Sequence, residues 1–256
     1  MTPKSLVGRL NPAAIHLPAS AAVAVLAALL IFAVWYPSPF DQMAGGVSLF
    51  VLLVSVDVVL GPALTFVAAD PAKRRSEFRR DLAVIVALQL AAFAYGIHTI
   101  SFPRPVYESY EIDRFRIVTA ADIETDELAK APADLRELPW RGPRVIAAVQ
   151  PRDPAEQFKA VELSLAGIHL SMLPSNWRPY GEENRHAWSA ARPVPVLVAK
   201  YPEISGDVAR LAAASGTAVD QLRFLPVLSR QVSWVAIVAP PDARVVGHLP
   251  VEGFFR

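Results

Sequence analysis

One acidic residue, Asp57, stands inside an apolar run that extends from Gly45 to Ala69. A charged side chain in the hydrocarbon core of a membrane costs about 3 kcal/mol or more unless a partner offsets it. The chemistry open to such a carboxylate includes ion pairing, proton transfer and proteolysis. An intramembrane aspartyl protease needs two carboxylates that share a site. Only one acid lies inside the apolar runs of this chain and the motif G-x-G-D is missing, so the sequence argues against proteolysis.

The other polar residues form no catalytic signature. The sequences G-x-S-x-G and H-E-x-x-H do not occur. The five histidines are scattered without the spacing of metal ligands: His16, His98, His169, His186 and His248. Glu182 and Glu183 beside Arg185 have the residue types of acid–base catalysis, but such a run is typical of the solvated face of a helix. We therefore expect no enzymatic activity, no metal and no cofactor.

The residue Asp57 belongs to the second of three apolar stretches, 17–36, 45–69 and 82–102. Each has about 20 residues, which at about 1.5 Å per residue crosses a hydrocarbon core of about 30 Å. The sequence therefore predicts three transmembrane helices, the first of which is an uncleaved signal anchor.

Basic residues predict the orientation of these helices. The connection 70–81 carries five Lys and Arg residues, whereas PSPFDQM after Tyr36 carries none. By the positive-inside rule, residues 1–16 and the basic loop 70–81 are cytoplasmic. Residues 103–256 then form a periplasmic domain.

Small residues surround Asp57 on one helical face. Gly46 and Gly61 share this face, and Pro62 is expected to kink the helix. Antiparallel packing would bring Gln89 of the third helix within about one turn of the depth of Asp57. Two interpretations stay open: a hydrogen bond between Asp57 and Gln89 that holds the bundle together, or an ion pair between Asp57 and a partner helix that bears a positive group.

The segment 103–256 has the size of one domain and a balanced charge, with 18 Lys and Arg against 19 Asp and Glu. We expect no nucleic-acid partner. Local patterns predict strands over 113–119, 145–149, 222–228, 232–238 and 245–249, and helices over 119–130, 154–165, 182–190 and 206–214. This α+β pattern is compatible with a thioredoxin-like arrangement, although a chain without cysteine has no thiol redox chemistry.

A group of aromatic residues and proline in this domain is a candidate recognition surface. Trp177, Pro179 and Tyr180 follow one another closely, and exposed aromatic residues beside prolines make recognition surfaces. The same pattern is typical of a local core or loop clasp, so both interpretations stay open.

Three stretches of the chain are similar to a known family: YPSPFDQMAGGVSLFVLLVSVDVVLGPALTFVAADPAKRR, RRDLAVIVALQLAAFAYG and RPVYESYEIDRFRIVTAADI. The similarity continues through MLPSNWRPY, RPVPVL and LRFLPVLSRQVSWVAIV, and its most specific part is Val56 to Pro62. The chain resembles the type IV pilin accessory proteins of the TfpX/TfpZ family.

The resemblance implies a non-catalytic accessory protein of a bacterial inner membrane that assists or modulates pilus assembly. Its partners would be the type IV pilin subunit, membrane lipids and other pilus assembly proteins. Pilins of this type rest in the membrane as one hydrophobic helix with a buried N-terminal amine, which offers Asp57 a partner. The alternative function is a membrane-anchored periplasmic domain that binds or senses another envelope component.

Overall fold

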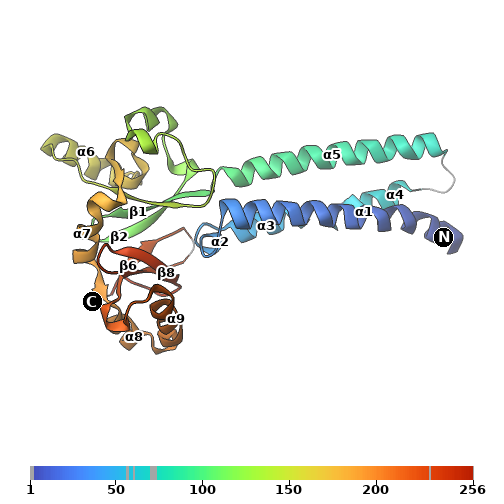
Figure 1. Ribbon diagram of the computed structural model, residues 1–256. Coiled ribbons are helices and arrows are strands. Elements are labelled where there is room, and N and C mark those ends of the chain that lie inside the picture. Colours follow the sequence, from blue (N-terminus) through green and yellow to red (C-terminus); the bar gives the residue numbers. More distant parts are fainter. Residues whose placement is uncertain (1–2, 56–57, 60, 70–73, 231, 256) are drawn as a thin grey trace.

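The computed structural model describes residues 3–55, 58–59, 61–69, 74–230 and 232–255, with side chains from residue 17 onward. It has two parts (Figure 1). The helical arm, residues 3–101, consists of helices, and the sheet domain, residues 105–255, is built around one β-sheet. Figure 1 shows the arm extending away from one end of the sheet domain.

The helical arm follows the predicted apolar stretches. In chain order its elements are α1 (Pro3–Leu30), the π-helical turn η1 (Ile31–Trp35), α2 (Phe40–Met43), α3 (Gly46–Ser55), α4 (Gly61–Ala68) and α5 (Arg75–Ser101). Among the described residues, Leu17–Trp35 and Arg75–Ser101 are long and apolar enough to cross a membrane, while α3 is apolar but shorter. The predicted second crossing includes residues 56, 57 and 60, which lie outside the described residues. The three transmembrane helices therefore stay a prediction.

Helix α5 starts earlier than its apolar stretch. It begins at Arg75, so three of the basic residues of the expected loop lie on its first turns. The carboxylate of Glu77 accepts a hydrogen bond from the Arg74 N–H at 3.3 Å. An acidic side chain in the first turn satisfies an N–H group and favours helix formation there.

The sheet domain contains one eight-stranded mixed sheet. Its strands are β1 (Pro105–Glu111), β2 (Arg114–Thr119), β3 (Arg144–Ala148), β4 (Trp177–Pro179), β5 (Arg192–Pro193), β6 (Arg223–Leu228), β7 (Trp234–Ala239) and β8 (Arg244–Leu249). Their order is β4-β3-β1-β2-β6-β7-β8, and β5 pairs with β6. The pairs β1–β3 and β2–β6 are parallel, and the remaining pairs are antiparallel.

The α+β class and all five predicted strands are confirmed, but the sheet does not have a thioredoxin-like arrangement. Such a fold joins its first two parallel strands through a helix. Here β1 and β2 form an antiparallel hairpin, with Tyr110 opposite Phe115 and Glu111 opposite Arg114. The tight turn at Ile112 and Asp113 returns the chain at once, so no helical crossover is needed.

The sheet domain also contains the helices α6 (Pro154–Leu165), α7 (Tyr180–Ala190), α8 (Val194–Lys200) and α9 (Ser205–Ser215), with short 3₁₀ turns between them. Helix α7 packs against one hydrophobic cluster of the sheet, and α8 and α9 pack against another. The helix predicted over 119–130 is instead two 3₁₀ turns, η3 (Ala120–Asp122) and η4 (Thr125–Lys130). The predicted capping box is present, because the Thr119 N–H donates to Asp122 Oδ2 at 2.9 Å. The first turn, η3, does not continue as an α-helix because the backbone becomes extended again at Ile123.

Candidate partner-binding site

Small residues let the helices of the arm approach one another. A Cβ atom on Gly46 would lie 2.7 Å from the Tyr36 ring, and one on Gly61 would overlap the amide of Gln89. Gly96 of α5 receives the side chain of Leu53 in the same way. Close contact at small residues is a principal means by which helices associate in lipid. Gly46 and Gly61 are therefore occupied by contacts within the arm.

Asp57 lies outside the described residues, but Gly61, one helical turn further along the chain, is described. Gly61 and Pro62 belong to α4. Helix α4 packs against both α1 and α5. Gln89 of α5 thus lies against Gly61, four residues beyond Asp57.

The turn α2 connects the arm to the sheet domain. The side chain of Met43 is fully buried in a core cluster that contains Phe115 and Leu225 of the sheet. Phe40 packs against the same cluster and meets the His248 ring edge to face, with 5.3 Å between the centroids. No local pattern in the sequence indicated this contact, because Phe40 and Met43 are far in the chain from the strands that they meet.

The histidine beneath Phe40 belongs to a buried ion pair. His248 Nε2 lies 2.7 Å from Glu108 Oε1, and only 8% and 2% of the two side chains are exposed. Burial alone would lower the pKa of His248, but the charge of Glu108 and the hydrogen bond to it outweigh this and raise the pKa above its usual value. The pair joins β1 to β8 and forms the seat of α2.

Two further contacts fix the arm at this junction. The Gly142 N–H of the sheet domain donates to the Val34 carbonyl at 2.6 Å. The Tyr36 hydroxyl donates to the Ile100 carbonyl at 2.8 Å, which ties the end of the first helix to the end of α5. The arm and the sheet domain therefore meet through several independent contacts rather than through a single linker.

The aromatic group of the sheet domain lies mainly in its interior. Trp177 is fully buried, and its Nε1–H donates to the Ser171 carbonyl at 2.8 Å. Pro179 pairs with Ile146 in the sheet, and the Tyr180 hydroxyl donates to the Ala243 carbonyl at 2.8 Å. These are the contacts of a local clasp, and no surface of Trp177 is left for a partner.

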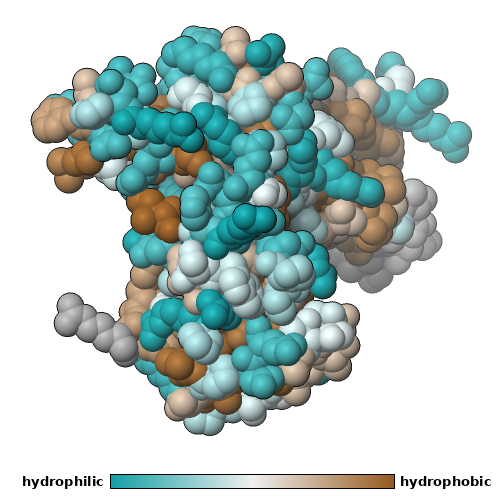
Figure 2. All heavy atoms as spheres, turned by 60° about the vertical axis from the view of Figure 1, so that its left-hand side comes forward, coloured by the Kyte–Doolittle hydropathy of each residue, from teal (hydrophilic) through white to brown (hydrophobic). Residues whose placement is uncertain are grey.

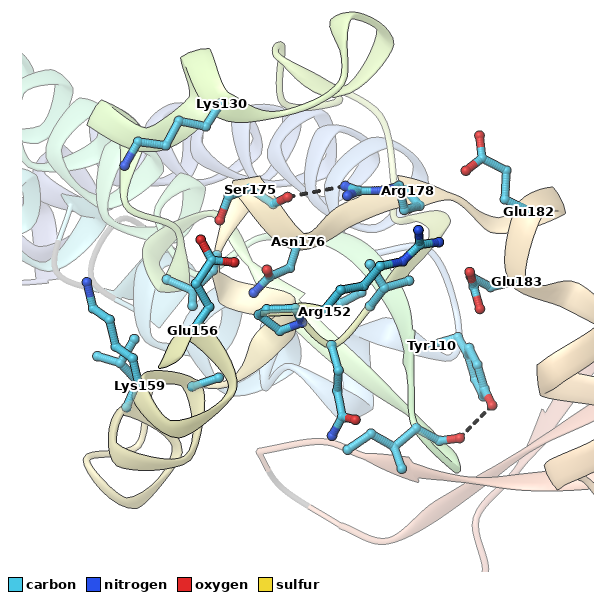
Figure 3. Close-up of a pocket in the computed structure, with 18 of the residues that line it drawn as sticks. Tyr110, Lys130, Arg152, Glu156, Lys159, Ser175, Asn176, Arg178, Glu182 and Glu183 are labelled. Carbon is cyan, nitrogen blue, oxygen red and sulfur yellow. Dashed lines mark hydrogen bonds between the residues drawn. The ribbon is translucent and has the colours of Figure 1, made fainter. Parts of the chain in front are cut away.

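A groove of about 1180 Å³ lies between α6, β4 and α7 (Figure 3). Figure 3 shows Glu156 and Lys159 on one side and Glu182 and Glu183 on the other. Charged residues of both signs line the groove: Glu127, Lys130, Arg152, Glu156, Lys159, Arg178, Glu182 and Glu183. These residues are dispersed over five segments of the chain, so no local pattern in the sequence could have revealed the groove.

Helix α6 has the predicted bounds but an unexpected environment. The carboxylate of Asp153 caps it, accepting from Ala155 N–H at 2.9 Å, and Gly167 with φ of 89° follows its end. None of its residues is buried. The side chains at helical spacing, which would ordinarily face a core, are largely exposed: Phe158 67%, Val161 58% and Leu165 87%. We call these three residues the α6 stripe. Brown hydrophobic patches also interrupt the hydrophilic surface of the sheet domain in Figure 2.

The fold and the candidate site define a class of protein in which an apolar helical arm is joined to an α+β domain. This domain has a charged groove and an exposed apolar stripe on its surface. Among the described residues, no group of three or more His, Asp or Glu could hold a metal ion.

Sequence comparisons identify the family. The family model of the fimbrial assembly protein FimB matches residues 4–45. Fimbrial assembly proteins of Dichelobacter nodosus serogroups I and E1 are each 34% identical over 226 residues, which is 88% of this chain and 88% of theirs. The protein of serogroups C1 and C2 is 44% identical over 117 residues, 46% of this chain and 89% of its own. No solved structure matches. The chain belongs to the family of fimbrial assembly proteins, in agreement with its resemblance to the type IV pilin accessory proteins.

Proposed function

We propose that the protein is a non-catalytic accessory protein of the inner membrane that assists or modulates type IV pilus assembly by contacting the pilin subunit. The observation that carries this proposal is the family relationship: relatives named fimbrial assembly proteins align with 88% of the chain, which includes both the arm and the sheet domain. An alignment over both parts supports a function that uses both.

The arm crosses the membrane three times in this proposal. Arg75, Arg79 and Arg80 are exposed at the end of α5 that is distant from the sheet domain. The opposite end, between Trp35 and Gly46, has no Lys or Arg. This asymmetry supports a cytoplasmic N-terminus and a periplasmic sheet domain.

The transmembrane part of the pilin contact involves the second apolar stretch. Val51 and Leu52 of α3 are 59% and 65% exposed, so this helix offers a surface to another hydrophobic helix. Asp57 would neutralise the N-terminal amine of that helix. Because Gly46 and Gly61 already receive Tyr36 and Gln89, the pilin helix would dock beside these glycines rather than into them.

The periplasmic part of the contact is the α6 stripe together with the groove beside it. Helix α6 lies on the part of the sheet domain that is distant from the arm (Figure 1), and its residues Glu156 and Lys159 line the groove. A pilin whose stem is in the membrane holds its globular head outside the membrane. A surface that contacts this head would therefore lie at a distance from the arm. Phe158 and Leu165 supply apolar contact area, and the charged groove supplies polar contacts.

Substitution of Asp57 tests the membrane contact in the full chain. Asp57→Asn and Asp57→Leu should reduce pilus number and pilin crosslinking, while Ser55→Ala, an exposed neighbour, should change neither. Wild-type pilus assembly and crosslinking in both Asp57 variants, with normal accumulation of the protein, would show that Asp57 does not pair with pilin. Its partner would then be internal, and Gln89→Leu should destabilise the arm.

The groove supports a second function, in which the sheet domain binds or senses another envelope component and the arm only anchors it. A volume of about 1180 Å³ lined by charges of both signs suits a polar or zwitterionic ligand. Affinity purification of the full chain distinguishes the two functions. Full recovery of pilin after charge reversal at Arg152 and Lys159 and after substitution of Val51 and Leu52 in α3 would favour the second.

A further inference from the structure

An exposed tryptophan lies where the sheet domain meets the arm. Trp140, in the loop between η5 (Ala133–Leu135) and β3, is 63% exposed. Its ring meets that of Trp35 edge to face, with 5.4 Å between the centroids. Trp35 is 2% exposed and ends the apolar segment Leu17–Trp35. Trp140 therefore lies at the level at which the first apolar helix ends.

Backbone contacts hold the Trp140 loop in this place. The Gly142 N–H donates to the Val34 carbonyl at 2.6 Å. Gly142 has φ of 34°, and a Cβ atom there would lie 2.8 Å from Pro37 Cγ, so only glycine fits. In Figure 1 the yellow-green chain of this region reaches the domain end of the arm. The loop is thus docked against the arm rather than free in solvent.

A second exposed aromatic residue marks the same level on the other long helix. Phe102 follows the last residue of α5 and is 55% exposed. The hydrogen bond from the Tyr36 hydroxyl to the Ile100 carbonyl, 2.8 Å long, ties the ends of the two helices together. Trp140 and Phe102 therefore stand at one height along the arm.

Each of these aromatic residues has an arginine beside it. Arg141 is exposed, and Arg104 is half-buried with its Nη1 donating to the Ser101 carbonyl at 2.9 Å. The nearest acidic residues before Trp140 are Asp134 in η5 and Glu137 in the loop, and both are exposed. We call Phe102, Arg104, Trp140 and Arg141 the junction belt.

We propose that the junction belt binds the phospholipid headgroup layer of the leaflet that faces the sheet domain. Tryptophan and other aromatic rings concentrate at membrane interfaces, where one end is apolar and the other is wet. Arginine beside them reaches the phosphates while its stem lies along the apolar boundary. The continuity of the belt with the apolar arm identifies lipid as the occupant. This proposal depends on the proposed membrane-spanning arm. Binding of the junction belt to headgroups would fix the height and tilt of the sheet domain above the membrane, and with them the position of the α6 stripe.

Lipid quenching of tryptophan emission tests the junction belt in the full chain. The protein is reconstituted into vesicles of phosphatidylcholine and phosphatidylglycerol that carry bromine either near the headgroup or near the chain end. The emission of Trp140 is obtained by subtracting the tryptophan fluorescence of the Trp140→Phe variant from that of the wild type. Shallow bromine should quench this difference roughly twofold more than deep bromine, and aqueous iodide should quench it weakly. Trp188→Phe is the control, because Trp188 packs under Arg223 inside the sheet domain.

A second variant keeps Trp140 in place. Arg141→Glu should reduce shallow quenching of Trp140 in vesicles that contain phosphatidylglycerol, because the added carboxylate is repelled by anionic headgroups. Quenching of Trp140 by iodide but not by brominated lipid, together with no effect of Arg141→Glu, would overturn the proposal.

Failure of the belt is distinguishable from failure of the membrane topology. The chain has no cysteine, so Ser76→Cys and Leu165→Cys, both at exposed positions, report which side of the membrane each end occupies. Labelling of the two cysteines from opposite sides without lipid quenching of Trp140 would refute the belt alone. Labelling of both from the same side would refute the spanning arm.

Discussion

The helices α2 and α6 carry similar apolar side chains in opposite surroundings. Helix α2 has four residues, yet it places Met43 at 0% exposure inside the sheet domain. Helix α6 has twelve residues and buries none of them. The comparison shows that apolar spacing indicates that a side chain needs a partner but does not indicate where the partner is. The partner of α2 is the sheet domain, and we propose that the partner of α6 is pilin.

The largest effect is expected at the seat of α2. Glu108→Ala removes one member of a buried pair and leaves His248 uncompensated beneath Phe40. Loss of one partner of a buried ion pair costs about 4 kcal/mol in the free energy of unfolding. Denaturation in detergent, followed by tryptophan emission, measures it. A change near zero would show that the seat does not hold the junction together.

The same pair predicts a dependence of stability on pH. Because the pKa of His248 is raised in the folded protein, its contribution is complete below the unfolded value of about 6.5 and is lost as the pH rises through the folded pKa. Glu108→Gln should remove this part of the pH dependence. An unchanged profile between pH 6 and pH 9 would contradict the assignment.

A matched pair of truncations compares the two helices directly. Met43→Ala should lower the free energy of unfolding by about 3 kcal/mol, because it opens a cavity in the core. Leu165→Ala, at 87% exposure, should change it by less than about 0.5 kcal/mol. Denaturant midpoints measured on both variants test the difference. Equal losses would mean that α6 is packed in solution and offers no free surface.

Disruption of the packing inside the arm is expected to cause a smaller loss of stability than the substitutions of Glu108 and Met43. Gly61→Leu should destabilise the arm by about 2 kcal/mol, because the new side chain displaces Gln89 from the contact between α4 and α5. Gly206→Leu is the control, since no atom lies within 4 Å of a Cβ there. Thermal loss of helical circular dichroism compares them, and equal stability of the two variants would argue against close packing at Gly61.

The smallest effect on stability and the largest on binding are expected at the α6 stripe. Serine in place of Phe158, Val161 and Leu165 should leave the free energy of unfolding unchanged but reduce the pilin that co-purifies with the chain severalfold. A matched triple variant replaces exposed apolar residues elsewhere in the sheet domain, Val196, Val219 and Val232, and should retain pilin. Full pilin recovery with the α6 variant would exclude the stripe from the interface.

Local patterns predicted the elements well. The helix over 154–165 has the predicted bounds because its cap at Asp153 and its glycine stop are local signals. Short apolar runs bounded by turns likewise predicted the strand over 223–228 and the hairpin that follows it. Where the signal depends on a few neighbouring residues, sequence alone was sufficient.

Contacts between distant segments could not be predicted in this way. The pair of Glu108 and His248 joins residues 140 positions apart, and nothing near either residue marks the other. The insertion of Met43 into the sheet domain depends on the orientation of the arm. Trp177 offered two local interpretations, and only its surroundings in three dimensions show that it is buried.

Photo-crosslinking in cells tests whether both the arm and the sheet domain contact pilin. A photoreactive residue is placed at Leu52 of α3 or at Leu165 of α6, both exposed, with Trp188 of the sheet domain as the partly buried control position. Crosslinks to pilin are expected from Leu52 and Leu165, and none is expected from Trp188. Absence of pilin crosslinks from either Leu52 or Leu165, in cells where the protein accumulates and supports pilus assembly, would contradict contact by both parts.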